Sequence, residues 1–255
     1  MTIQAMSLNK DFVTKSREVV HALHDINLTI EEGQFVSVIG PSGCGKSTLL
    51  KILAGLLPSS SGHVILDGQP ILKPTRDMGT VFQEARLLPW MTVLENVLLP
   101  ARIHKLDPSA SLQKARSLLE LTGLADFAST YPFELSGGMQ QRVAICRALV
   151  HDPEHLLMDE PFGALDAMTR EHLNVELLRI WSTSQKTVVF ITHSIPEAVF
   201  LSDVVVVMAS RPGRIREVIQ VDLPRPRLVE SMSSKGFVEL TAHLRSLFNA
   251  KGDLH

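Results

Sequence analysis

The stretch FVSVIGPSGCGKSTLLKIL, residues 35–53, decides the fold. Its first five residues are mostly β-branched or aromatic, which predicts a buried strand. Gly40, Gly43 and Gly45 follow within six residues and predict a tight loop. The apolar residues of 49–53 then recur with helical spacing. The order strand, glycine-rich loop, helix is typical of α/β proteins built on a parallel sheet.

The loop fits the pattern G-x-x-x-x-G-K-[ST] over residues 40–47. Glycines let backbone N–H groups approach a phosphate closely, and the N-terminus of the following helix adds positive partial charge. Lys46 adds a full charge, and the Ser47 hydroxyl is a ligand type that Mg²⁺ accepts. An accidental Lys-Ser after a glycine-rich turn is the alternative, and the flanking strand and helix argue against it. The predicted phosphate site comprises Gly40, Pro41, Ser42, Gly43, Cys44, Gly45, Lys46, Ser47 and Thr48.

A second element, HLLMDEP at residues 155–161, places two carboxylates after an apolar strand. Open parallel sheets bind ligands at the carboxyl ends of their strands. Because successive side chains of a strand diverge, the two acids cannot have the same role. We assign Asp159 to magnesium and Glu160 to the attacking water. A helix N-cap or a surface acidic pair is the alternative when this element is considered by itself.

A third element, LSGGMQQR at residues 135–142, opens an amphipathic helix. The Ser136 hydroxyl, the bare backbone at Gly137 and Gly138, and the helix dipole together predict another anion site. A flexible N-cap and turn is the alternative. The chain thus carries two phosphate-binding helix starts.

Composition excludes several classes of protein. The 25 Lys and Arg residues nearly balance 27 Asp and Glu, so no global basic field attracts nucleic acid, and none is expected as a partner. The two cysteines, Cys44 and Cys146, favour neither a disulfide framework nor a zinc site. We find neither a secretory signal nor an apolar segment of transmembrane length. A mean hydropathy of +0.14 predicts apolar surface kept for a partner.

Periodicity extends the α/β pattern along the chain. Alternation predicts a half-buried strand at 26–30, and short apolar runs predict buried strands at 155–158 and 187–192. Helical spacing dominates residues 92–149 and recurs at 173–181. A terminal amphipathic helix is predicted from Phe237, Leu240, Leu244, Leu247 and Phe248.

Together these motifs resemble the ATP-binding-cassette (ABC) ATPases, from about Phe12 to about Arg227. The matches are Walker A GPSGCGKST, the signature LSGGMQQR, Walker B HLLMDE, Gln83 in VFQE, Ala164-Leu165-Asp166, and His193 in FITHS. The resemblance implies an α/β P-loop NTPase core with an N-terminal antiparallel β-subdomain and an inserted α-helical subdomain. We expect the core and β-subdomain at 1–85 and 151–228, the helical subdomain at 86–150, and the C-terminal amphipathic helix at 229–255.

The resemblance also implies roles for single residues. Gln83 looks like the loop glutamine that senses Mg²⁺ and the attacking water, and His193 like the switch histidine that contacts the γ-phosphate of ATP. Phe12 occupies the place of an aromatic residue that stacks on adenine, although a core Phe is an equal explanation. Asp166 resembles a residue that contacts a partner subunit, and an N-cap role is compatible. The nucleotide-binding set also includes Ser136, Gly137, Gly138 and Gln140, and the metal set comprises Ser47, Gln83 and Asp159.

Family resemblance further implies a head-to-tail homodimer that encloses two MgATP. Residues 162–181, the RPGRI segment at 211–215 and VDLPRPR at 221–227 look like those of nitrate, sulfonate and taurine importers. Permease subunits would then receive residues 84–92, and the resemblance places the apolar surface for this partner at 87–90, with ordinary packing within the helical subdomain as the alternative. A substrate-binding protein would act indirectly from outside the cell. The expected place is the cytoplasmic face of a prokaryotic inner membrane. A non-transport ABC ATPase acting on a soluble or nucleic-acid partner is the alternative, and it predicts a basic stripe or an insertion, neither of which we find.

Two further expectations concern side-chain surroundings. Cys44 lies beside Lys46 and a helix N-terminus, which predicts a lowered thiol pKa and inactivation by thiol reagents. The arginines of the C-terminal segment alternate with acidic residues and predict a solvated face. These arginines are Arg214, Arg216, Arg225 and Arg227.

Overall fold

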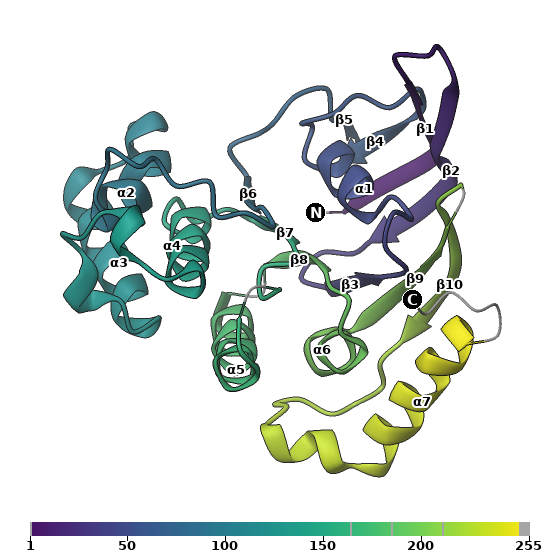
Figure 1. The fold of residues 1–255 in the computed structure, drawn as a ribbon. Helices are drawn as coiled ribbons and strands as arrows, with labels where there is room; N and C mark the ends of the chain where they lie inside the picture. Colours follow the sequence, from purple (N-terminus) through teal and green to yellow (C-terminus); the bar gives the residue numbers. More distant parts are fainter. Residues whose placement is uncertain (1, 164, 185, 211, 250–255) are drawn as a thin grey trace. The chain divides into compact units, whose positions relative to one another are not determined.

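The computed structural model describes residues 2–163, 165–184, 186–210 and 212–249. The chain divides into two compact units. The first unit comprises Met1–Thr75 and Trp181–His255, and the second comprises Arg76–Ile180. Figure 1 shows the elements of each.

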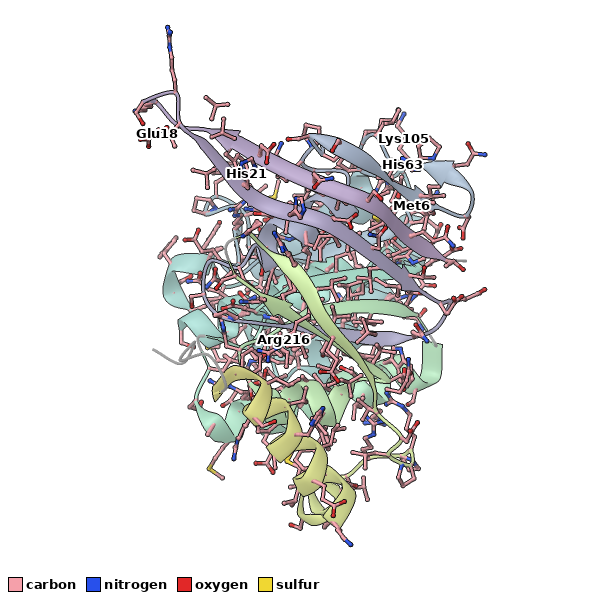
Figure 2. The ribbon with its side chains drawn as sticks, turned by 90° about the vertical axis from the view of Figure 1, so that its right-hand side faces the viewer. Met6, Glu18, His21, His63, Lys105 and Arg216 are labelled. Atoms are coloured by element: carbon pink, nitrogen blue, oxygen red, sulfur yellow. The ribbon has the colours of Figure 1, made fainter. Side chains whose placement is uncertain are left out.

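The first unit contains an antiparallel sheet with the strand order β2-β1-β4-β5. In β2 (Val19–Ile30), Ile26, Leu28 and Ile30 are buried while the residues between them are exposed, which confirms the predicted alternation. β1 and β2 form a long hairpin with Glu18 near its tip (Figure 2). The remaining strands are β1 (Ile3–Val13), β4 (Ser61–Leu66) and β5 (Gln69–Pro70).

A second sheet in the first unit has the order β10-β9-β3-β8. β3 (Phe35–Ile39) pairs in parallel with both β8 (Thr187–Ile191) and β9 (Val204–Ala209), which confirms the predicted parallel arrangement. Every residue of β3 and β8 is buried. β10 (Arg214–Gln220) adds an antiparallel edge.

Helices α1 (Lys46–Leu53), α6 (Ile195–Leu201) and α7 (Lys235–Asn249) belong to the first unit, with the 3₁₀ turn η3 (Val229–Ser233) before α7. α7 packs against α6 and buries Phe237, Leu244 and Phe248, as its amphipathic pattern predicts. Residues 250–255 of the expected C-terminal segment lie outside the described residues.

The second unit is mostly helical, with α2 (Val93–Ile103), α3 (Pro108–Leu121), α4 (Gly137–Leu149) and most of α5 (Ala167–Ser184). Two 3₁₀ turns, η1 (Ala125–Phe127) and η2 (Pro132–Glu134), lie before α4. β6 (Met78–Val81) pairs in parallel with β7 (His155–Asp159). Thr92 and Glu95 cap the start of α2 reciprocally, the Thr92 N–H lying 2.8 Å from the Glu95 carboxylate.

Within the described residues, no helix is long and apolar enough to cross a bilayer.

His151 lies just beyond α4, buried, with its ring 5.4 Å from that of His104. Burial lowers the pKa of His151, and the positive charges of His104, Arg76 and Lys114 lower it further, while a hydrogen bond with the Met78 backbone opposes them. The folded chain therefore binds a proton at His151 less readily than the unfolded chain does.

This difference predicts a pH-dependent stability. As pH falls below about 6.5, the unfolded state gains the proton first, so the free energy of unfolding drops by at most about 1.4 kcal/mol per pH unit. His151→Gln should weaken this dependence in urea unfolding between pH 7.5 and 5.5. The matched variant His63→Gln changes an exposed histidine (Figure 2) and should leave the slope as it is. An unchanged slope in His151→Gln would contradict the assignment.

Candidate active site

The phosphate loop joins the end of β3 to the start of α1 and requires glycine at defined positions. Gly43 and Gly45 have φ values of +77° and +93°, which side chains rarely adopt. A Cβ at Gly40 would lie 2.7 Å from the Cys44 Sγ, and one at Gly45 would lie 2.6 Å from a Leu23 methyl group. At Gly43, by contrast, a Cβ would meet no atom within 4 Å. The loop is thus packed tightly against neighbouring atoms at Gly40 and Gly45, and it faces open space at Gly43.

Lys46 is buried and turns back over this loop. Its Nζ donates hydrogen bonds to the carbonyl oxygens of Gly40, at 2.8 Å, and Pro41, at 3.1 Å. α1 starts at Lys46, and the preceding Gly45, at the N-cap position, offers no side chain to cap it; its first turn contains no acidic residue. The ammonium group and the helix start therefore present positive charge on one loop, which fits a polyphosphate anion.

The expectation for Cys44 is wrong. Its side chain is buried, and burial raises the pKa of the thiol, outweighing the lowering effect of the Lys46 charge. Position next to a cation was visible in the sequence, but the loss of water around the sulfur was not. Cys44 is a packing residue beneath the loop, against which Gly40 lies closely.

In the second unit, β7 ends at Asp159, and all five of its residues are buried. Glu160 follows in a left-handed conformation with φ of 47°, a conformation that costs a residue with a side chain about 1–2 kcal/mol. This backbone turn, rather than strand alternation alone, gives the two acids different surroundings. The Gln83 Nε2 donates a hydrogen bond of 3.3 Å to the Glu160 Oε2. Two residues that are 77 positions apart in the sequence, and that were predicted to contact the same water, thus meet.

Helix α4 holds the loop that carries Gln83. The Gln141 amide donates to the Phe82 carbonyl at 2.9 Å. The Arg147 guanidinium donates to the carbonyls of Ala85, at 2.7 Å, and Arg86, at 2.9 Å. These roles of Gln141 and Arg147 were not predicted from the sequence. The one available signal was that they are polar residues on a helix that is mostly buried.

The start of α4 combines a cap with open backbone. The Ser136 Oγ accepts a hydrogen bond from the Met139 N–H, so the hydroxyl serves the helix itself. A Cβ added at Gly137 would meet no atom within 4 Å, whereas one at Gly138 would lie 2.6 Å from Leu165. The Gln140 amide donates to the carbonyls of Pro132 and Leu135, and so it holds the preceding turn.

The remaining predicted residues are placed as follows. His193 is exposed just beyond β8. The Phe12 ring is 41% exposed, with the Lys10 ammonium 5.1 Å from its centroid. Asp166 accepts the Thr169 N–H at 3.0 Å and so caps α5, as its alternative reading allowed. Ala164 lies outside the described residues.

Two arginines contradict the expectation of a solvated face. Arg227 is only 4% exposed. Arg225 forms an ion pair of 2.7 Å with Asp203, and its guanidinium lies 4.1 Å from the centroid of the Trp181 ring. The acidic residues that alternate with the arginines in sequence do not decide which side chains are buried, because the chain folds back over α6.

The fold and the phosphate loop define the class as a P-loop ATPase. The chain belongs to the ABC transporter family, whose model matches residues 23–163. The aliphatic sulfonates import ATP-binding protein SsuB of Bacillus cereus is 47% identical over 252 residues, which cover 99% of this chain and 98% of SsuB. The taurine import ATP-binding protein TauB of Pelagibacter ubique is 48% identical over 213 residues, 84% of this chain and 80% of TauB.

A solved structure is similar over most of the chain. It is the dimeric bacterial ABC transporter cassette MJ0796, with a TM-score of 0.79 and 35% sequence identity, covering 87% of this chain and all of MJ0796. MJ0796 has also been solved in a post-hydrolysis state bound to ADP and Pi, again with a TM-score of 0.79. The P-loop ABC-ATPase fold with its antiparallel β-subdomain and helical elements is thereby confirmed.

Proposed function

We infer that this chain is the ATP-hydrolysing subunit of an importer of small anionic solutes. Two copies dimerise around MgATP and drive separate permease subunits. The observation that carries the hydrolytic part is the Gln83–Glu160 hydrogen bond, because it joins the carboxylate after β7 to the loop glutamine. An acid held in this way can orient a water molecule for in-line attack on the γ-phosphate of ATP.

The phosphate loop would bind the nucleotide. Lys46 would exchange its loop carbonyls for phosphate oxygens, which are stronger acceptors because they are charged. Phe12 offers an exposed ring face to adenine. Ser47, Gln83 and Asp159 would hold Mg²⁺, which neutralises charge on the phosphates. His193, exposed at the end of β8, would donate to the γ-phosphate.

A dimer would explain why the backbone at the start of α4 is left uncovered. Gly137 has unoccupied space where a side chain would lie, and the helix N-terminus there favours an anion. In a head-to-tail dimer, Ser136, Gly137 and Gly138 of one copy would cover ATP on the phosphate loop of the other. The dimeric form of MJ0796 supports a dimer of this chain.

The relatives suggest the solute. SsuB and TauB carry names for the import of aliphatic sulfonates and of taurine, and SsuB aligns with nearly the full chain. We propose a sulfonate, taurine or nitrate-like anion, delivered by an extracytoplasmic binding protein. The chain itself would lie at the cytoplasmic face of the membrane and contact only the permease.

Trp90 marks the surface proposed for the permease. Its side chain is 70% exposed, next to the exposed Pro89. Val93, three residues further on, is buried, and its N–H donates to the Thr130 carbonyl at 2.9 Å, which brings the segment around Thr130 alongside. That segment exposes Phe133, stacked on Tyr131 at a centroid distance of 5.7 Å. Exposed aromatic residues in adjoining segments are typical of protein interaction surfaces.

The function can be tested in proteoliposomes that contain the permease subunits of a sulfonate, taurine or nitrate importer, taken from the same genome, with the chain supplied at the ATP side. Labelled taurine, an alkanesulfonate and nitrate are offered separately with the cognate binding protein. ATP-dependent accumulation of one of them is expected. ATP hydrolysis that no permease stimulates, together with no accumulation, would overturn the importer assignment and leave a non-transport ATPase.

In the same vesicles, Trp90→Glu should reduce transport at least tenfold, because a charge would have to be desolvated against the permease. ATP affinity of the isolated chain should stay within twofold of the parental value. Phe127→Glu alters another exposed aromatic residue of the second unit and provides a comparison. Parental transport by Trp90→Glu would rule out this docking surface.

A further inference from the structure

Arg227 forms an unusual set of backbone contacts. Its Nη1 donates to the carbonyl oxygens of Val199, Phe200 and Ser202, at 3.1, 3.1 and 2.7 Å. Its Nη2 donates to the carbonyls of Val221 and Leu223, at 3.3 and 3.2 Å. One buried guanidinium thus joins the C-terminal end of α6 to the segment that follows β10. Burial lowers its pKa to about 10, so the group keeps its charge at neutral pH.

α6 depends on such contacts because it spans only the seven residues Ile195–Leu201. A helix of two turns is not stable by itself, and its last carbonyls have no partner within the helix. A positive charge at that end also complements the helix dipole. Losing the guanidinium would leave several carbonyls buried without a donor.

The other end of α6 begins directly after His193. Ser194 caps the helix by accepting the Glu197 N–H at 3.3 Å. The Thr192 hydroxyl donates to the buried Glu197 carboxylate at 2.5 Å and accepts the Ser194 N–H at 3.0 Å. The backbone on both sides of His193 is therefore tied to the first turn of α6, and a shift of the helix would move the histidine.

The C-terminal end of α6 is also fixed to β3, the strand that leads into the phosphate loop. The Ser202 hydroxyl donates to the Ser37 hydroxyl in the middle of β3. Asp203 and Phe35 exchange two bonds, the Asp203 N–H donating to the Phe35 carbonyl at 2.8 Å and the Phe35 N–H to the Asp203 carboxylate at 2.9 Å. β3 precedes α6 in the sequence, whereas Arg227 follows it, so the C-terminal end of α6 is held by residues from both sides along the chain.

We propose that Arg227 is a positioning residue for ATP hydrolysis, which sets the place of His193 relative to the phosphate loop by clamping the C-terminal end of α6. The inference rests on the proposed function, since it takes His193 to contact the γ-phosphate. The proposal assigns a role in catalysis to the VDLPRPR segment at 221–227, which was not predicted from the sequence. Small displacements of an aligned group can cost large factors in rate.

The test measures single-turnover hydrolysis of labelled ATP by the full chain at saturating MgATP, together with ATP affinity. Arg227→Met removes all five donated bonds. Arg227→Lys keeps the positive charge but lacks the planar guanidinium that reaches both the end of α6 and the segment after β10. If Arg227→Met does not fold, Arg227→Lys tests the proposal. We expect the hydrolysis rate to fall at least tenfold in each folded variant, with ATP affinity within twofold of the parental value.

The matched control is Arg216→Met. Arg216, on β10 (Figure 2), also donates to a backbone carbonyl, but that carbonyl belongs to Leu247 of α7 and not to α6. Its removal should leave the hydrolysis rate within twofold of the parental value. The histidine ring signals in NMR spectra add a readout that is independent of activity. The His193 signal, identified by its loss in His193→Ala, should shift in the Arg227 variants and not in Arg216→Met.

A double-mutant cycle separates positioning from general stability. If Arg227 acts through His193, Arg227→Lys should slow hydrolysis much less in a His193→Ala background than in the parental chain. If Arg227→Lys slowed hydrolysis equally in both backgrounds, the inference about Arg227 would be overturned while the proposed function stood. The same follows if Arg227→Lys hydrolysed ATP at the parental rate while His193→Ala was impaired. A parental rate in His193→Ala would instead contradict the role of His193 in the proposed function, and the inference with it.

Discussion

Glu160→Gln should bind ATP and dimerise but hydrolyse ATP about 10²- to 10⁴-fold more slowly than the parental chain. The glutamine has nearly the same shape, and its amide oxygen can still accept the Gln83 hydrogen bond that the carboxylate accepts at 3.3 Å. It lacks the negative charge that polarises water and accepts its proton. The loss should therefore fall on the chemical step.

The measurement pairs phosphate release with light scattering in the presence of MgATP. The variant should accumulate as a dimer, because hydrolysis no longer opens it. Glu154→Gln, at the exposed position just before β7, makes the same chemical change away from the site and should behave as the parental chain does. Turnover at the parental rate by Glu160→Gln would show that another group activates the water.

Lys46→Met should weaken ATP binding about 10- to 150-fold, the loss expected from one hydrogen bond to a charged group worth about 1.5–3 kcal/mol. A second effect adds to the first. The Lys46 ammonium also donates to the carbonyls of Gly40 and Pro41, so the loop loses an internal clamp when the side chain is replaced. Methionine keeps a similar length and apolar stem, which limits damage to the packing.

Binding is measured by calorimetry with MgATP, and the free energy of unfolding is measured without nucleotide. Lys51→Met, on the same helix one turn and a half further along, is the control and should retain parental affinity. If Lys46→Met bound ATP with parental affinity, the phosphate loop would not be the nucleotide site. The Glu160 and Lys46 variants together separate hydrolysis from binding.

Much of the fold was predictable because the relevant signals are local. The five buried residues of β3, the three glycines of the loop and the apolar spacing of α1 lie within one short stretch. Backbone conformation at a glycine and the burial of an apolar run depend mainly on neighbours in the sequence. The alternation of Ile26, Leu28 and Ile30 and the amphipathic pattern of α7 were readable for the same reason.

Predictions failed where a side chain's surroundings come from distant parts of the chain. Cys44 was expected to be reactive because Lys46 is its neighbour, yet burial dominates the pKa of its thiol. The C-terminal arginines were expected to be solvated, yet Arg227 is enclosed by carbonyls that precede it by up to 28 residues. Desolvation depends on how many segments surround a group, which spacing within one segment does not report.

The sequence by itself determined the class of protein, because motifs such as the phosphate loop place chemically necessary groups on continuous pieces of chain. Only the tertiary structure decided how those pieces are held. In the folded chain, Gln83 donates a hydrogen bond to Glu160, and Gln141 and Arg147 donate to backbone carbonyls of the loop that carries Gln83. Arg227 is enclosed by backbone carbonyls at the C-terminal end of α6. The physical reason is that backbone carbonyls exist at every position, so their side-chain partners are selected by three-dimensional proximity rather than by any residue pattern.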